Sequence, residues 1–177
     1  MGKRLFSAFF LFVGATGTFG KEPDLPPPGP DQQQQIDRMF DLTNRLRAER
    51  RIPILGLDAS LCHAAAMHAE EMCRYNYVSD RGHGILMQSN PGSRAWACGY
   101  AWSSIAETVC AGSSDVASVL RSWLSSRRHA RILMDPEYQD AGIGMARGVT
   151  RTYWVLMLAT KPRNSSPGKS WNLRVTL

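Results

Sequence analysis

Glu107 is the carboxylate in this sequence that most strongly suggests a functional site. It lies in an apolar run, between Ile105 and Val109, and burying a carboxylate without a partner is costly. His129, which follows Trp123 on a predicted helical stretch, and a backbone N–H group are the natural partners. Such a pair would be either a buried polar clamp that stabilises the fold or a ligand or acid–base pair.

A metal-dependent hydrolase is the catalytic interpretation of these residues. A hydrolytic metal site needs about three protein ligands and an open position. Glu107 and His129 would supply two ligands, and Asp80 or His83 would supply the third. The segment 68–71 reads His-Ala-Glu-Glu and lacks the second histidine of an HExxH zinc motif. We therefore expect no resident cofactor and keep a divalent metal as the alternative.

Nucleophilic catalysis has little support, and we assign no catalytic residue. The serines of the chain lack the G-x-S-x-G setting of a nucleophile elbow. His68 lies on the apolar stripe of a predicted helix, with Leu61, Ala65 and Met72. This spacing predicts a hydrogen-bonded core histidine.

Helical and strand patterns are segregated along the chain, which favours an α+β fold. Helices are expected from Ile36 to about Arg50, from Asp58 or Ser60 through residue 75, from Ser113 or Ser114 onward, and over 127–134. Strands are expected over 105–109, 141–148, 152–160 and 171–176, with a hairpin joining the second and third. Residues 79–99 are rich in Gly, Ser, Asn and Pro and predict a long loop, with room for a short helix.

The first 20 residues resemble a secretory leader. Lys3 and Arg4 precede an apolar run over 5–13, and small residues lead to a cleavage site after Gly20. The run is too short for a membrane span, so we expect a secreted, extracellular protein with no stable span. Cleavage would remove two basic residues and no acid, lowering the formal net charge from +6 to +4. The remaining basic residues are scattered, which argues against nucleic-acid binding.

Four cysteines in an exported chain predict two disulfides. Cys62 and Cys73 are separated by about 16 Å along one helix, beyond the roughly 7 Å between Cα atoms that a disulfide allows. Cys62 would therefore pair with Cys98 or Cys110, and Cys73 with the other.

Five segments in order resemble a bacterial-type CAP domain, the superfamily of cysteine-rich secretory, antigen 5 and pathogenesis-related class 1 proteins, also called the SCP domain. The segments contain N-x-x-R at 44–47, L-x-x-x-A-x-x-H-A-x-x-M at 61–72, the strand around Glu107, W-x-x-S with His129, and G-x-G before a Tyr-Trp strand. The resemblance implies a three-layer α-β-α sandwich around a central, mainly antiparallel sheet. It also implies a cleft to which Glu107 and His129 belong, with Asp80 in place of a family histidine and His83 nearby.

The resemblance divides the chain into a leader (1–20), a Pro/Gln-rich linker (21–35), a CAP domain (36–161) and a tail (162–177). It implies a secreted, non-catalytic module that binds a lipid, a peptide or a cell-surface component, with the metal-dependent hydrolase as the alternative. We expect a monomer whose partner is a small lipid or an extracellular protein.

Overall fold

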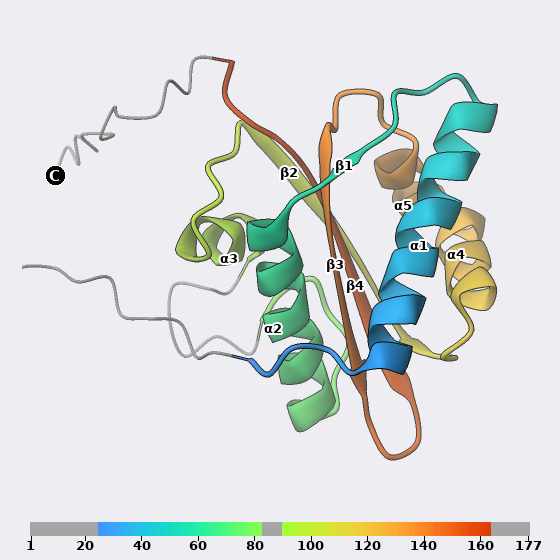
Figure 1. The fold of residues 1–177 in the computed structure, drawn as a ribbon, viewed down its shortest axis with the longest axis vertical. Coiled ribbons are helices and arrows are strands. Elements are labelled where there is room, and N and C mark those ends of the chain that lie inside the picture. Colours follow the sequence, from blue (N-terminus) through green and yellow to red (C-terminus); the bar gives the residue numbers. More distant parts are fainter. Residues whose placement is uncertain (1–24, 83–89, 164–177) are drawn as a thin grey trace, which may run out of the picture.

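Helices cover both faces of a four-stranded sheet (Figure 1). The computed structural model describes residues 25–82 and 90–163. One face carries α2 and α3, and the other carries α1, α4 and α5. This arrangement confirms the predicted three-layer α+β fold. The elements are α1 (Pro30–Glu49), β1 (Gly56–Leu57), α2 (Ala59–Tyr75), α3 (Pro91–Ala97), β2 (Ser104–Gly112), α4 (Val116–Ser125), α5 (Arg127–Leu133), β3 (Asp140–Arg147) and β4 (Thr152–Thr160).

The strand order is β1-β3-β4-β2, with antiparallel pairing of β3 and β2 to β4 and parallel pairing of β1 to β3. β4 lies in the interior of the sheet and is buried from Thr152 to Ala159. The sheet is therefore mainly antiparallel, and β2 forms one of its edges.

Alternation along the strands builds two cores. Ile143, Met145 and Leu156 belong to the core beneath α1, α4 and α5, whereas Val155 and Met157 belong to the core beneath α2 and α3. Successive strand residues point to opposite faces, so two apolar faces need helices on both sides.

Two glycines allow α2 to lie directly on β3. A Cβ atom at Gly142 would be 2.1 Å from the backbone carbon of Leu61, and one at Gly144 would be 2.2 Å from that of Ala65. Neither distance is sterically possible for a side chain. The G-x-G sequence is thus explained by helix–sheet packing.

The N-x-x-R sequence is explained by a buried arginine in the opposite core. Arg47 is fully buried and donates hydrogen bonds to backbone carbonyl groups, while Asn44 exchanges two hydrogen bonds with the backbone of Leu55. These contacts fix α1 against the segment that leads into β1. The four carbonyl acceptors of Arg47 belong to Pro53, Leu133, Asp135 and Tyr138, at 2.8, 2.8, 3.0 and 3.2 Å.

The outer edge of β3 is contacted by four groups in turn. Amide groups of Gly56 and Asp58 donate to the carbonyl oxygens of Gln139 and Ala141. Farther along, the Cys62 thiol lies next to the backbone of Ile143. The Gln32 side chain donates to the carbonyl of Met145.

Helix boundaries differ from expectation at two positions. α1 begins at Pro30, so residues 30–35 of the expected linker form its first turns. α4 is capped by Asp115, whose carboxylate accepts from the Ser118 amide, and not by either preceding serine. The predicted leader, His83 and the strand predicted over 171–176 lie outside the described residues.

The predicted disulfides are wrong. Cys62, Cys73, Cys98 and Cys110 are all free thiols. Both expected pairings join Cys110 to a cysteine of α2, but Cys110 packs in the core beneath α1, α4 and α5, on the opposite face of the sheet from α2. The sheet itself separates the partners.

Within residues 25–82 and 90–163, no helix has both the length and the apolar character required to cross a membrane.

Candidate functional site

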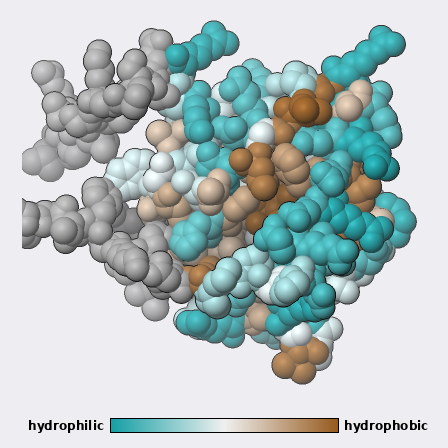
Figure 2. All heavy atoms as spheres, in the orientation of Figure 1, coloured by the Kyte–Doolittle hydropathy of each residue, from teal (hydrophilic) through white to brown (hydrophobic). Residues whose placement is uncertain are grey.

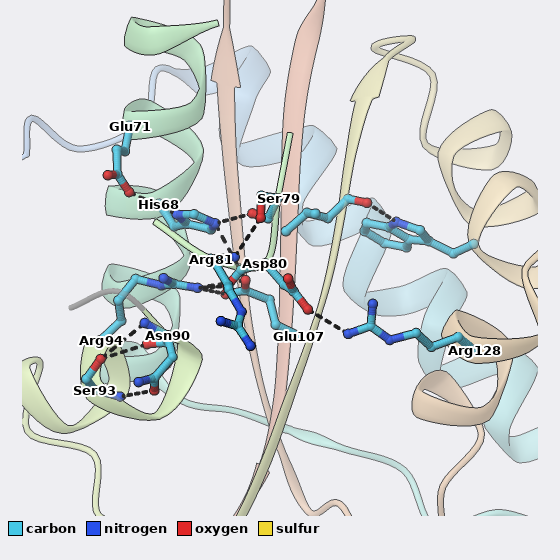
Figure 3. Close-up of polar contacts among 12 residues, drawn as sticks. His68, Glu71, Ser79, Asp80, Arg81, Asn90, Ser93, Arg94, Glu107 and Arg128 are labelled. Atoms are coloured by element: carbon cyan, nitrogen blue, oxygen red, sulfur yellow. Dashed lines mark hydrogen bonds and ion pairs between the residues drawn. The ribbon is translucent and has the colours of Figure 1, made fainter. Parts of the chain in front are cut away.

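Glu107 forms a buried ion pair with Arg94 (Figure 3). Its side chain extends from β2 toward α2 and α3 and is fully buried. Nη2 of Arg94 donates to Oε1 at 2.7 Å and to Oε2 at 2.9 Å. The carboxylate that the sequence singled out is therefore neutralised by a cation from α3.

α3 is built to hold Arg94 in this position. Asn90 and Ser93 form a reciprocal capping box, and Pro91 occupies the first helical turn, where its missing N–H group costs nothing. Nη2 of Arg94 also donates to the carbonyl oxygen of Asp80 at 3.1 Å. Arg94 thus joins α3, β2 and the segment after α2.

His68 completes the buried cluster from α2. Its Nε2 donates to the carbonyl oxygen of Ser79 at 2.8 Å and lies 3.6 Å from Oε1 of Glu107. Its Nδ1 lies 3.2 Å from Oε2 of Glu71. The ring is fully buried, which confirms the predicted hydrogen-bonded core histidine.

Burial controls the protonation of both groups. It raises the pKa of Glu107 to about 7, although the Arg94 guanidinium acts in the opposite direction. It lowers the pKa of His68, and the positive charge of Arg94 lowers it further. In the cluster, Glu107 and His68 are therefore neutral over a wider pH range than they would be in water.

Asp80 and His129 lie outside this buried cluster. The carboxylate of Asp80 faces Arg128 of α5, at 2.6 Å, and only its backbone oxygen reaches Arg94. The Arg128 side chain is 69% exposed, so this ion pair is a surface contact past the edge strand β2 (Figure 3).

His129 is half-buried on α5. Burial, and secondarily Arg128, lower its pKa, whereas Asp80 raises it. Among the described residues, no hydrogen bond or ion pair joins His129 to Glu107. The structure places Arg94 and His68 where we expected His129, and His83 lies outside the described residues.

The described residues around Glu107 do not fit a metal ion. The described part of the chain contains no group of three or more His, Cys, Asp or Glu side chains that could hold one. Both oxygens of Glu107 already accept from a guanidinium group, and the Asp80 carboxylate faces a different arginine. A cation of the protein itself occupies the coordination space at Glu107.

Arg94 is the site residue that the sequence analysis missed. It lies in the stretch 79–99, which has no hydrophobic periodicity to predict its orientation. The available signal was the Asn90-Pro91 pair followed by Ser93, which is typical of a capped helix start.

The sequence pattern of the cysteine-rich secretory protein (CAP) family matches residues 40–158 of this chain. The curated protein YkwD of Bacillus subtilis is 22% identical over 107 residues, which are 60% of this chain and 40% of that protein. The chain thus spans less than half the length of this relative.

Solved structures share the fold. An extracellular protein containing an SCP domain from Bacillus anthracis has a TM-score of 0.68 at 23% identity, over 77% of this chain and 45% of that one. An outer surface protein of Borrelia burgdorferi has a TM-score of 0.68 at 16% identity, over 75% and 96% of the two chains. These similar proteins are extracellular or surface proteins. The chain belongs to the cysteine-rich secretory protein family and has its α+β CAP fold.

Proposed function

We propose that the protein is an exported, non-catalytic binding module for a lipid, a peptide or a cell-surface component. The ion pair between Arg94 and Glu107 is the observation that carries this proposal. A carboxylate that accepts from an arginine at both oxygens, inside a closed cluster, is poorly placed to act as a base or nucleophile. The extracellular relatives support export.

The rim of this cluster is the surface we assign to binding. Asp80, Arg128 and His129 lie around the edge strand β2, outside the buried pair. Their ion pair is exposed, and exposed pairs contribute about 0–1 kcal/mol, so a ligand can replace it at little cost. Carboxylate, guanidinium and imidazole groups together suit a polar headgroup or a peptide backbone.

The raised pKa of Glu107 favours the catalytic alternative. A carboxylic acid with a pKa of about 7 matches the requirement for acid–base catalysis near neutral pH. The hydrolase interpretation therefore needs a direct test at this residue.

Hydrolysis assays on the secreted protein and its Glu107→Gln variant separate the two functions. Both proteins are incubated with a chromogenic short-chain ester and a fluorogenic peptide, with and without added Zn²⁺. We expect no turnover by the wild type above that of the variant. Metal-dependent turnover that Glu107→Gln abolishes, in a variant that remains folded by circular dichroism, would establish the hydrolase instead.

Binding is tested on the same preparation. Organic extraction and mass spectrometry identify a co-purified lipid, and the Arg128→Gln variant reports on the rim. We expect the variant to retain less of any bound molecule than the wild type, with unchanged stability. Equal retention by the two proteins would place binding elsewhere.

A further inference from the structure

The β3–β4 turn and the end of α2 form one exposed end of the molecule, far from Glu107. We call it the hairpin-tip surface and define it by Arg74, Tyr75, Arg147, Val149 and Arg151. The two segments are joined by Asn76, which accepts hydrogen bonds from Arg151 and from the Tyr153 hydroxyl. In Figure 1 the turn projects at the bottom of the molecule, beside the end of α2.

Val149 is at the tip of this surface and is fully exposed. In Figure 2, which has the orientation of Figure 1, an isolated hydrophobic group projects at the lower end of the molecule, where Figure 1 shows the β3–β4 turn. One exposed apolar side chain by itself needs no explanation. Here, however, Tyr75 is a second exposed side chain of amphipathic character, 55% exposed, at the neighbouring helix end.

Arginines flank the apolar tip on both sides. Arg147 and Arg151 are each two residues from Val149. The Arg151 guanidinium is held by neutral groups only, since it donates to the Tyr153 hydroxyl and to Asn76 and lies over the Tyr153 ring. Neither positive charge is paired with a carboxylate in the described part of the chain; Arg147 is exposed, and Arg151 is half-buried.

Asp115, an acidic group beside the turn, faces its own helix. Asp115 follows Ser114, which lies at the turn, but its carboxylate accepts from the backbone and hydroxyl of Ser118. An open hollow of about 370 Å³ lies against the turn. It provides room beside the arginines for an anionic headgroup. The hollow is lined by Gly112, Ser114 and residues 147–152.

We propose that the hairpin-tip surface docks on an anionic lipid surface, with Val149 entering the interface and Arg147 and Arg151 meeting lipid phosphates. Charge complementarity selects this occupant, because two arginines unpaired with any described carboxylate, around an apolar tip, match a layer of phosphates over hydrocarbon. Tyr75 suits the same boundary, where amphipathic aromatic rings gather. This inference goes beyond the proposed function, because it concerns a different surface and makes no use of the Glu107 cluster.

Vesicle co-sedimentation tests the proposal on the secreted protein. Vesicles of phosphatidylcholine alone are compared with vesicles containing about 30% phosphatidylglycerol, at 0.1 M salt. At about 1 kcal/mol for each arginine near the surface, Arg147→Gln should weaken binding to the anionic vesicles about 5-fold. Arg147→Gln with Arg151→Gln should weaken it about 30-fold, and Val149→Asp should also weaken it.

The matched control removes the same charge at the other end of the molecule. Arg45 and Arg50 are exposed near the end of α1, opposite the turn in Figure 1. Replacing both with Gln should leave binding within about 2-fold of wild type if the surface is local rather than a diffuse effect of net charge. Val149→Asp touches no core residue, so it tests the proposal even if Arg151→Gln disturbs folding.

Three results of the vesicle experiment would overturn the proposal. The first is that the wild type binds anionic and neutral vesicles equally well. The second is that the control variant and the hairpin variants lose binding to the same extent. The third is that Arg147→Gln and Val149→Asp both bind as the wild type does. Inorganic phosphate that shifts the NMR signals of residues 147–152, without vesicle binding, would also overturn it and leave a site for free phosphate. None of these outcomes bears on the hydrolysis assays, so the two proposals can fail separately.

Discussion

Arg47 and Arg94 are both buried, but the acceptors that bind their guanidinium groups differ. Arg47 donates to four backbone carbonyl groups in the core beneath α1 and α5. Arg94, on the other face of the sheet, donates to the carboxylate of Glu107 and to one carbonyl oxygen. Carbonyl groups do not titrate, whereas a carboxylate does. The Arg47 region should therefore behave as a fixed structural joint, and the Arg94 region should respond to pH.

The largest effect is expected at Arg47. Arg47→Met would leave four buried carbonyl groups without their donors, and each unsatisfied group costs about 1–3 kcal/mol. Allowing for relaxation, we expect a loss of about 3–5 kcal/mol in the free energy of unfolding, measured with denaturant. Because none of the four acceptors titrates, the loss should be the same at pH 5 and at pH 8. A loss that differs between the two pH values would contradict the proposed difference between the Arg47 and Arg94 regions.

Arg94→Met should cost somewhat less, and its cost should depend on pH. Removing one partner of a buried ion pair costs about 3–5 kcal/mol when the other charge stays buried. At pH 8 Glu107 is mostly ionised in the wild type, so we expect a loss of about 3 kcal/mol. At pH 5 Glu107 is protonated and needs no cation, so the loss should be smaller. Denaturant unfolding at both pH values measures the difference.

Glu107→Gln should show the opposite pH trend. The folded-state pKa of Glu107 is raised from 4.5 to about 7, so its contribution to stability is fully present below pH 4.5. This contribution is lost as the pH rises toward 7. We expect the variant to cost about 1–3 kcal/mol near pH 5 and less at pH 8. A cost that grows with pH would mean that Arg94, and not burial, controls the carboxylate.

The smallest effect is a coupling energy. Glu107 contacts Arg94 and has no hydrogen bond or ion pair with His129 among the described residues. A double-mutant cycle of Glu107→Gln with Arg94→Met should give a coupling of at least about 0.5 kcal/mol. The same cycle with His129→Ala should be additive within about 0.5 kcal/mol. Equal coupling energies in both cycles would show that His129 interacts with Glu107 as Arg94 does.

Periodicity explains which parts of this fold could be predicted. The helices and hairpin follow from apolar spacing, and the position of Glu107 within an apolar strand marked it correctly as a buried acid. The same alternation also indicates which face of the sheet Cys110 occupies. Glu107 and Cys110 are three residues apart on β2, so their side chains face opposite sides of the sheet. Once Glu107 faces α2, Cys110 cannot reach the cysteines of that helix.

The partner of Glu107 could not be predicted in the same way. Arg94 lies on a seven-residue helix inside a long polar stretch, and its approach to β2 depends on how that stretch folds over the sheet. Local sequence predicts the start of such a helix, but its tertiary placement is decided by contacts distant in sequence. His68 was easier to interpret because the stripe that contains it also defines its environment.

The outer edge of β3 has a consequence for self-association. An open strand edge is a template for pairing with another chain. β1 covers only two residues of this edge, and the Cys62 thiol and the Gln32 side chain contact the next two outward positions of the backbone. Side chains thus continue the pairing where the short strand stops. The long, otherwise regular β3 offers an incoming strand few free positions, and the protein is protected from edge-to-edge aggregation on this side.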